Sequence, residues 1–189
     1  MMNNSMRVFI AVPVGNIPSV IRYIDELKRE FSGEYFKWTV PSQLHFTLNF
    51  LGETGEEVMN RLPEKLASAL STVESGIVDI TGPGYFGKKN LPSVLWLGTD
   101  NNQLLKELWI RVSKAVGEVI PGETDTRFSP HLTVARIKRI NDTERFHEIV
   151  TNRKADRIHR LNIEKVILYK SDLRPEGPLY TPLNEFRLR

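Results

Sequence analysis

Two segments of the sequence repeat one pattern of residue types. His45-Phe46-Thr47-Leu48 is followed 86 residues later by His131-Leu132-Thr133-Val134, and both are His-x-Thr-x tetrapeptides with apolar residues at x. In a β-strand, successive side chains point to opposite faces, so each His and Thr project together while the apolar residues point into a core. Two such strands can supply two imidazoles and two hydroxyls to one cleft. That set is complete for acid–base chemistry on a phosphodiester.

A simpler interpretation is that two half-exposed strands each happen to carry a histidine. The chain has only four histidines, and two of them stand in identical contexts. The repetition therefore favours a shared site over coincidence.

The composition indicates a folded chain with limited ligand chemistry. With 189 residues and 40% hydrophobic content, the chain can bury a core, and we expect one bilobal domain over residues 1–189. It has no cysteine, so neither disulfides nor a thiolate zinc site is available. No apolar run reaches the length of a membrane helix, and residues 1–6 are too short and polar for a signal peptide. We therefore predict a cytoplasmic protein.

The charge is unevenly distributed along the chain. The net charge is +3, with −1 over residues 1–120 and +4 over residues 121–189. A basic C-terminal half suits a polyanionic partner, although a solvated surface is the better explanation of the charge alone. His159 stands among Arg153, Lys154, Arg157 and Arg160, which predicts a basic surface patch there.

The two tetrapeptides must be positioned by alternating strands and helices. Apolar periodicity predicts strands over 7–14, 43–51, 76–85, 93–98, 131–137, 161–171 and 180–188, and helices over 17–31, 54–70, 103–119 and 143–152. Asn16 and a capping box at Thr54 to Glu57 are the expected helix starts, and Pro63 should kink or interrupt its helix. This order predicts an α+β fold of two similar lobes around a central cleft. Each lobe would be a mainly antiparallel sheet with helices on its outer face.

Two other strings resemble functional motifs without their required context. Gly82 to Gly87 fits the dinucleotide pattern G-x-G-x-x-G, but no helix follows it, so we expect a loop. His147 begins a zincin-like string that has Thr151 where the second histidine must stand. We therefore predict no metal site.

Longer segments around the tetrapeptides carry a family resemblance. They are Arg7 to Ala11, His45 to Glu53, Leu95 to Gly98, Phe128 to Arg136 and Gly177 to Tyr180. In these segments the chain resembles the 2H phosphoesterase superfamily, and within it the RNA 2′,3′-cyclic phosphodiesterases, also called 2′-5′ RNA ligases. One His-x-Thr is a weak signal, but two inside their expected flanks are a strong one.

The resemblance implies a role for each motif residue. His45 would be the general acid on the leaving 3′ oxygen and His131 the general base on water, which gives a 2′-phosphate end. The sequence alone does not fix that direction. Thr47 and Thr133 would donate hydrogen bonds to the phosphate oxygens where charge develops.

Two further residues are candidates for substrate binding. Arg136 matches an arginine that pairs with phosphate in the family, but strand parity places it on the opposite face from His131 unless the strand ends or bulges first. Phe128 could stack a base, and a place in the core is the alternative.

The implied substrate is RNA or a nucleotide that ends in a 2′,3′-cyclic phosphate, opened without any cofactor or metal by a monomer. The same histidines could catalyse the reverse reaction, 2′-5′ ligation, as a minor activity. A rival hypothesis is a noncatalytic RNA-end-binding protein. Turnover of a cyclic nucleotide in the presence of a chelator discriminates the two.

Metal independence is the first testable prediction. Because the chain lacks cysteine and its histidines lack ligand spacing, turnover of a 2′,3′-cyclic nucleotide should survive exhaustive EDTA treatment. The measurement is the turnover rate before and after dialysis against the chelator. Loss of turnover that a stoichiometric metal restores would contradict the acid–base scheme.

Overall fold

The strands join into one antiparallel sheet. The computed structural model describes residues 5–122, 127–175 and 177–189. Within these residues the strands are β1 (Met6–Pro13), β2 (Tyr35–Trp38), β3 (His45–Thr54), β4 (Gly76–Lys88), β5 (Leu91–Asp100), β6 (Leu132–Arg139), β7 (Arg157–Ile163), β8 (Lys165–Arg174) and β9 (Gly177–Arg187). The helices are α1 (Pro18–Glu30), α2 (Glu56–Leu70), α3 (Gln103–Gly117) and α4 (Thr143–Arg153), with a 3-10 turn, η1 (Pro41–Gln43). No helix in these ranges is long and apolar enough to cross a membrane.

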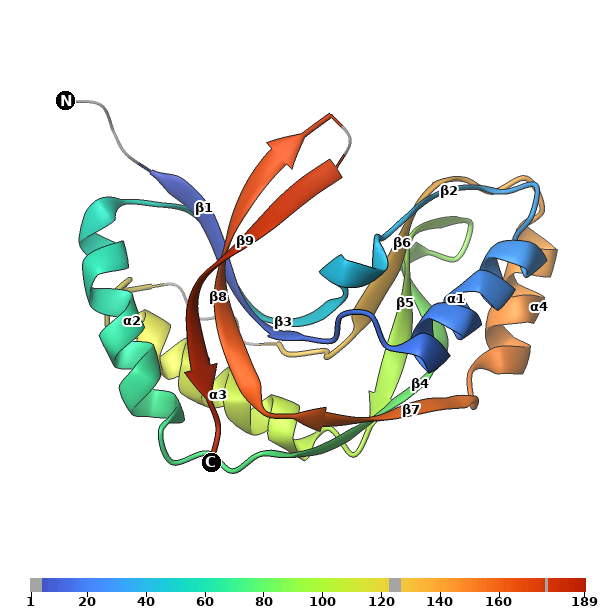
Figure 1. The fold of residues 1–189 in the computed structure, drawn as a ribbon. Coiled ribbons are helices and arrows are strands. Elements are labelled where there is room, and N and C mark those ends of the chain that lie inside the picture. The colour runs from blue at the N-terminus through green and yellow to red at the C-terminus, as the bar shows by residue number, and fades with distance from the viewer. Residues whose placement is uncertain (1–4, 123–126, 176) are drawn as a thin grey trace.

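The sheet divides into the two expected lobes. Its strand order is β7-β4-β5-β6-β3-β1-β8-β9, with β2 also paired to β6. We call β7, β4, β5, β6 and β2 the β6 lobe, and β3, β1, β8 and β9 the β3 lobe. In the β6 lobe, α1 contacts β7 and α4 contacts β4. In the β3 lobe, α2 and α3 pack against each other, with α2 on β9 and α3 on β3. Figure 1 shows one helix pair beside each lobe, which confirms the α+β prediction.

The two motif strands meet at the centre of the sheet. Strands β3 and β6 pair antiparallel through Phe46 and Leu132, the second residue of each tetrapeptide. Both side chains are fully buried in the core, together with Leu48 and Val134. The apolar positions of both tetrapeptides therefore anchor the strands from behind, as their alternation predicted.

One predicted strand is in fact two. The prediction over 161–171 is wrong because β7 ends at Ile163 and β8 begins at Lys165. The two strands have different neighbours, since β7 pairs with β4 at one end of the sheet and β8 pairs with β1 in the other lobe. The chain crosses between lobes here, and an apolar run carries no signal for such a crossing.

The predicted starts of two helices, at Asn16 and at the Thr54 capping box, are wrong. Helix α1 is preceded by Ile17 and α2 by Gly55, and neither residue makes a side-chain cap. The Thr54 hydroxyl instead donates to the Gly52 carbonyl. Helix α2 continues through Pro63 without interruption.

The glycine-rich string over 82–87 lies in strand β4 and is not a loop. Gly84 stands under the Trp96 ring of β5, where an added Cβ would come within 2.1 Å of a ring carbon. The glycine is required by this close approach, because any side chain would displace the ring.

An ion-pair cluster joins α1, α4 and the segment that leads into β7 of the β6 lobe. The Arg153 guanidinium donates to Glu30 at 3.0 Å and lies 3.3 Å from a Glu26 oxygen. It also lies 3.5 Å from Asp156, which accepts a 2.8 Å hydrogen bond from the Tyr23 hydroxyl. Burial and the Asp156 carboxylate raise the pKa of Tyr23, so the phenol stays protonated.

We expect Arg153→Gln to lower the free energy of unfolding by about 1–2 kcal/mol, because the carboxylates lose a shared partner in a half-buried site. Urea denaturation of variant and wild type measures the change. The matched control is Arg160→Gln, whose exposed ion pair with Asp79 should contribute little. Equal midpoints for both variants would show that the cluster does not hold the helices.

Candidate active site

A cavity of ≈ 750 Å³ is lined by residues from both lobes. His45 and Thr47 of the β3 lobe face it, as do His131 and Thr133 of the β6 lobe. Antiparallel pairing about Phe46 and Leu132 brings each histidine toward the threonine of the opposite motif. The structure thus gathers the four motif residues at one site.

Both histidines are held in the same way by backbone. His45 Nδ1 lies 2.7 Å from the carbonyl oxygen of Gln43, and His131 Nδ1 lies 2.8 Å from that of Ser129. Because a carbonyl oxygen only accepts, each Nδ1 carries a proton and donates it. The Nε2 atom of each ring is then the nitrogen that exchanges protons with a molecule in the cavity.

Aromatic rings enclose His45. The Phe9 ring centroid lies 5.0 Å from that of His45, and the Tyr180 ring meets the imidazole edge-on at 5.3 Å. Burial lowers the pKa of His45 below its usual 6.5, and a positive charge on His131 lowers this pKa further. The hydrogen bond from Nδ1 to the Gln43 carbonyl opposes the shift only partly. Enclosure therefore favours the neutral form of His45 in the free protein.

The other two histidines of the chain have different surroundings. His147 Nε2 lies 2.9 Å from the Lys89 carbonyl, and His159 Nδ1 lies 3.0 Å from the Ser19 hydroxyl. Neither lines the cavity. Within the described residues, no cluster of three His, Asp or Glu side chains could hold a metal ion.

A β-bulge follows the threonine in each motif strand. In β3, Thr47 pairs with Ala11 but Asn49 pairs with Ile10, so Leu48 is the extra residue. In β6, Thr133 pairs with Trp96 but Ala135 pairs with Leu95, so Val134 is the extra residue. Each strand then buries two consecutive side chains, which reverses the alternation beyond the bulge.

The bulges bring the fifth residue after each histidine back to the cavity. This residue is Phe50 in β3 and Arg136 in β6, and both line the cavity. Strand parity would have placed Arg136 on the opposite face, so the bulge at Val134 decides its position. No sequence signal marked Phe50, because alternation from His45 assigns it to the core.

The cavity is strongly cationic. Arg7, Lys37, Arg136 and Arg174 line it, whereas no carboxylate does among the residues that the structure describes. Lys37 and Arg136 are direct cross-strand partners in β2 and β6. Like charges in that position repel each other, so an anion bound between them would relieve the repulsion.

Lys37 is a site residue that was not predicted, because it lies in strand β2, which was also not predicted. The signal was present in the alternation of Phe36, Lys37 and Trp38, which is typical of a short strand.

Phe128 is the one predicted site residue that does not line the cavity. Its ring stacks on Trp109 of α3 at 5.3 Å and 5°, packed against the core, and it does not line the cavity. The Phe128 ring therefore packs against the core, which was the alternative to stacking a base. The basic patch around His159 is likewise outside the cavity lining, and its Arg153 and Arg160 are engaged with carboxylates.

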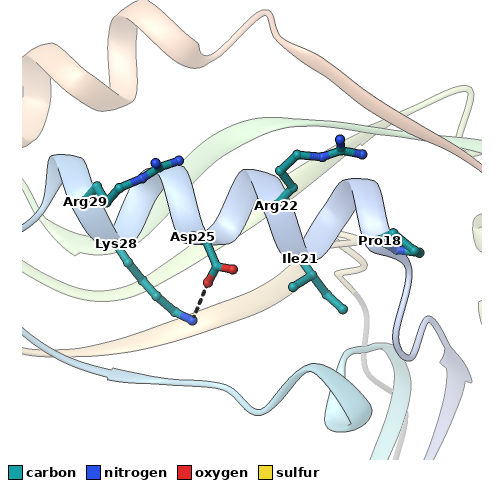
Figure 2. A pocket seen from close by; sticks show the side chains of 6 residues that line it. All are labelled: Pro18, Ile21, Arg22, Asp25, Lys28 and Arg29. Atoms are coloured by element: carbon teal, nitrogen blue, oxygen red, sulfur yellow. Dashed lines mark hydrogen bonds and ion pairs between the residues drawn. The ribbon is translucent and has the colours of Figure 1, made fainter.

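A second hollow of ≈ 760 Å³ lies on the surface of α1 (Figure 2). All the residues that line it belong to this one helix: Pro18, Ile21, Arg22, Asp25, Lys28 and Arg29. Lys28 and Asp25 neutralise each other at 2.8 Å. Despite its similar size, this hollow lacks the convergent groups from several elements that chemistry requires.

Known proteins resemble the chain over nearly its whole length. The RNA 2′,3′-cyclic phosphodiesterase of Methanothermobacter thermautotrophicus is 31% identical over 97% of this chain and 99% of its own. That of Archaeoglobus fulgidus is 32% identical over 96% of this chain and 99% of its own. The crystal structure of a Thermus thermophilus protein superposes with a TM-score of 0.76 at 28% identity, covering 97% of this chain and 98% of the other. Escherichia coli LigT in apo form, at 19% identity, shares the fold with a TM-score of 0.74 over 97% of this chain and 98% of its own.

Paired His-x-Thr-x strands at the junction of two antiparallel lobes define a 2H phosphoesterase. The sequence also matches the 2′-5′ RNA ligase superfamily over residues 18–174. The chain belongs to the 2′-5′ RNA ligase superfamily, and the expected family is confirmed.

The burial of His45 predicts the pH range in which its imidazole titrates. We expect its imidazole to titrate below pH 6.5 in the free protein, and added inorganic phosphate to raise this pKa because an anion stabilises the imidazolium. Since the unfolded chain protonates first, the free energy of unfolding should fall as pH drops through 6.5.

Nuclear magnetic resonance of the imidazole protons, with His45→Asn to assign the signal, measures the titration directly. A midpoint at or above 6.5 without phosphate would contradict the burial of the His45 imidazole.

Proposed function

We propose that the protein is an RNA 2′,3′-cyclic phosphodiesterase that opens a terminal cyclic phosphate to a 2′-phosphomonoester. The observation that carries the proposal is the pair of imidazoles, each fixed through Nδ1, on one cationic cavity. The names of the curated relatives support the same substrate. We treat residues 1–189 as one bilobal domain, and its cytoplasmic location and monomeric state stay predictions.

The reaction replaces one P–O bond by another. A water oxygen attacks phosphorus while the bond from phosphorus to the ribose 3′ oxygen breaks, with the two oxygens roughly in line. His131 takes the proton of the water, and His45 gives a proton to the leaving 3′ oxygen. The 2′ oxygen keeps the phosphate, so atoms and charge balance without any cofactor.

The lowered pKa of His45 makes its acid role depend on the substrate. Enclosure in the free protein favours the neutral imidazole, but a bound phosphodiester anion favours the imidazolium. Substrate binding therefore shifts His45 toward the protonated form that an acid needs. Thr47 and Thr133 donate hydrogen bonds to the oxygens where negative charge develops, and Lys37 and Arg136 supply positive charge.

The site is also compatible with one further activity and with one noncatalytic alternative. The reverse reaction, in which a 5′-hydroxyl replaces water, gives a 2′-5′ linkage and should be minor in water. A noncatalytic RNA-end-binding protein would retain the cationic cavity but would not turn over a cyclic nucleotide.

We expect His45→Ala and His131→Ala each to lower kcat for a nucleoside 2′,3′-cyclic phosphate by about 10²- to 10⁴-fold, the range for loss of a general acid or base. The double variant should be less than additive, because the two groups act as a unit. Matched controls are His147→Asn and His159→Asn, which change histidines outside the cavity and should keep wild-type kinetics. Near wild-type turnover in either alanine variant would remove that histidine from the mechanism.

The same variants distinguish acid from base. A phosphodiester with a nitrophenolate leaving group needs no proton on that group, so the variant that lacks the acid should hydrolyse it with a smaller defect than the cyclic substrate. We expect this partial recovery in His45→Ala and not in His131→Ala. The opposite pattern would exchange the two roles.

A further inference from the structure

The Gln43 side chain makes a contact that the mechanism above does not use. Gln43 ends the η1 turn, two residues before His45, and its Nε2 atom donates a hydrogen bond to the Pro178 carbonyl at 2.5 Å. Pro178 lies in β9, the strand at the end of the sheet. Both residues line the cavity. The side chain therefore joins the turn that leads into a motif strand to a strand far from it in the sequence.

This hydrogen bond closes a ring of contacts around His45. The backbone carbonyl of Gln43 accepts the proton of His45 Nδ1 at 2.7 Å. Two residues after Pro178 in β9, the Tyr180 ring meets the imidazole edge-on at 5.3 Å. The contacts thus run from the imidazole through Gln43, Pro178 and Tyr180 and back to the imidazole.

The rings beside the other histidine need no such connection. Trp96, whose ring centroid lies 6.5 Å from that of His131, is the direct cross-strand partner of Thr133. Tyr180, in contrast, belongs to β9, which β1 and β8 separate from the motif strand β3. Its place on His45 therefore depends on how the sheet curves, and the hydrogen bond from Gln43 holds β9 directly to the start of β3.

We propose that the Gln43 side chain is a positioning residue for His45. By binding the Pro178 carbonyl, it holds Tyr180 against the imidazole and fixes the peptide whose carbonyl orients Nδ1. This inference rests on the proposed function, in which His45 is the general acid, and adds a residue that acts on the acid without touching the reacting atoms. Glutamine suits this role, because its amide nitrogen donates while its backbone carbonyl accepts.

The titration of His45 tests the proposal without any turnover. Gln43→Met removes the amide donor and keeps an unbranched side chain of similar length. Because burial is the main cause of the lowered pKa of His45, release of the Tyr180 ring should move the titration midpoint up toward 6.5. Nuclear magnetic resonance of the imidazole measures the midpoint in the variant and the wild type. An unchanged midpoint would overturn the proposal.

Kinetics distinguish positioning from direct contact with the substrate. We expect Gln43→Met to lower kcat for a nucleoside 2′,3′-cyclic phosphate by about three- to tenfold, the size of one hydrogen bond, with KM nearly unchanged. The nitrophenyl phosphodiester, whose leaving group needs no proton, should show a smaller defect. A rise in KM for both substrates at constant kcat would show that Gln43 binds the substrate itself, and would overturn the positioning role.

Gln103→Met is the matched control. Gln103 is the only other glutamine of the chain, and it is exposed at the start of α3, outside the cavity lining. The same substitution there should leave the His45 titration and kcat at wild-type values, and equal effects in both variants would overturn the proposal. Gln43→Asn keeps the amide on a side chain one methylene shorter and should reproduce the effects of Gln43→Met. Effects confined to Gln43→Met would assign them to lost polarity in the cavity and overturn the Pro178 contact as their cause.

A double-mutant cycle tests whether Gln43 acts through Tyr180. Tyr180→Leu removes the ring that meets the imidazole and should itself move the His45 midpoint toward 6.5. Adding Gln43→Met to this variant should then change the midpoint little, because the two substitutions break the same ring of contacts. Full additivity would overturn the coupling. Absence of turnover in the wild type would overturn the proposed function alone, because the titration midpoints do not depend on catalysis.

Discussion

The single backbone pairing between β3 and β6 is the constraint on which the site depends. Phe46 and Leu132 pair at the junction of the two lobes, and both side chains are buried in the core behind the sheet. Because the strands run antiparallel from this point, the histidine of one motif meets the threonine of the other. A slip of either strand by one residue would turn the imidazole of that strand into the core. Burial of the apolar residues thus fixes the register, and the register determines which polar side chains face the cavity.

The polar face of the junction combines apolar enclosure with positive charge. Phe9 and Tyr180 exclude water from His45 and favour its neutral form, while Arg7, Lys37 and Arg174 make the same cavity attractive to anions. These two effects have opposite consequences for the imidazole before and after a phosphate binds. The free protein disfavours the charged acid, and a bound anion stabilises it. In the proposed mechanism, this coupling supplies the proton on His45 when a phosphate binds.

The motif strands of the two lobes contain the same kind of β-bulge, followed by different side chains. Each motif strand bulges at the fourth residue of its tetrapeptide, Leu48 or Val134, and then presents the next cavity residue. In one strand that residue is Phe50 and in the other it is Arg136. A bulge re-aims a side chain without moving the strand, because the extra residue is absorbed locally and the pairing continues. The repeated backbone therefore places the histidine and threonine of both motifs on the cavity, whereas the residues beyond the two bulges differ in chemical type.

The sequence by itself determined the paired motifs, the α+β order and the family. Motif residues and amphipathic periods are local properties, so they can be read without knowing what packs against them. Only the tertiary structure decided the faces of Phe50 and Arg136, because a bulge depends on the neighbouring strand. It also decided the break at Glu164, the contribution of Lys37 and the position of Phe128 on Trp109. Each of these depends on long-range pairing, which brings together residues that the sequence keeps far apart.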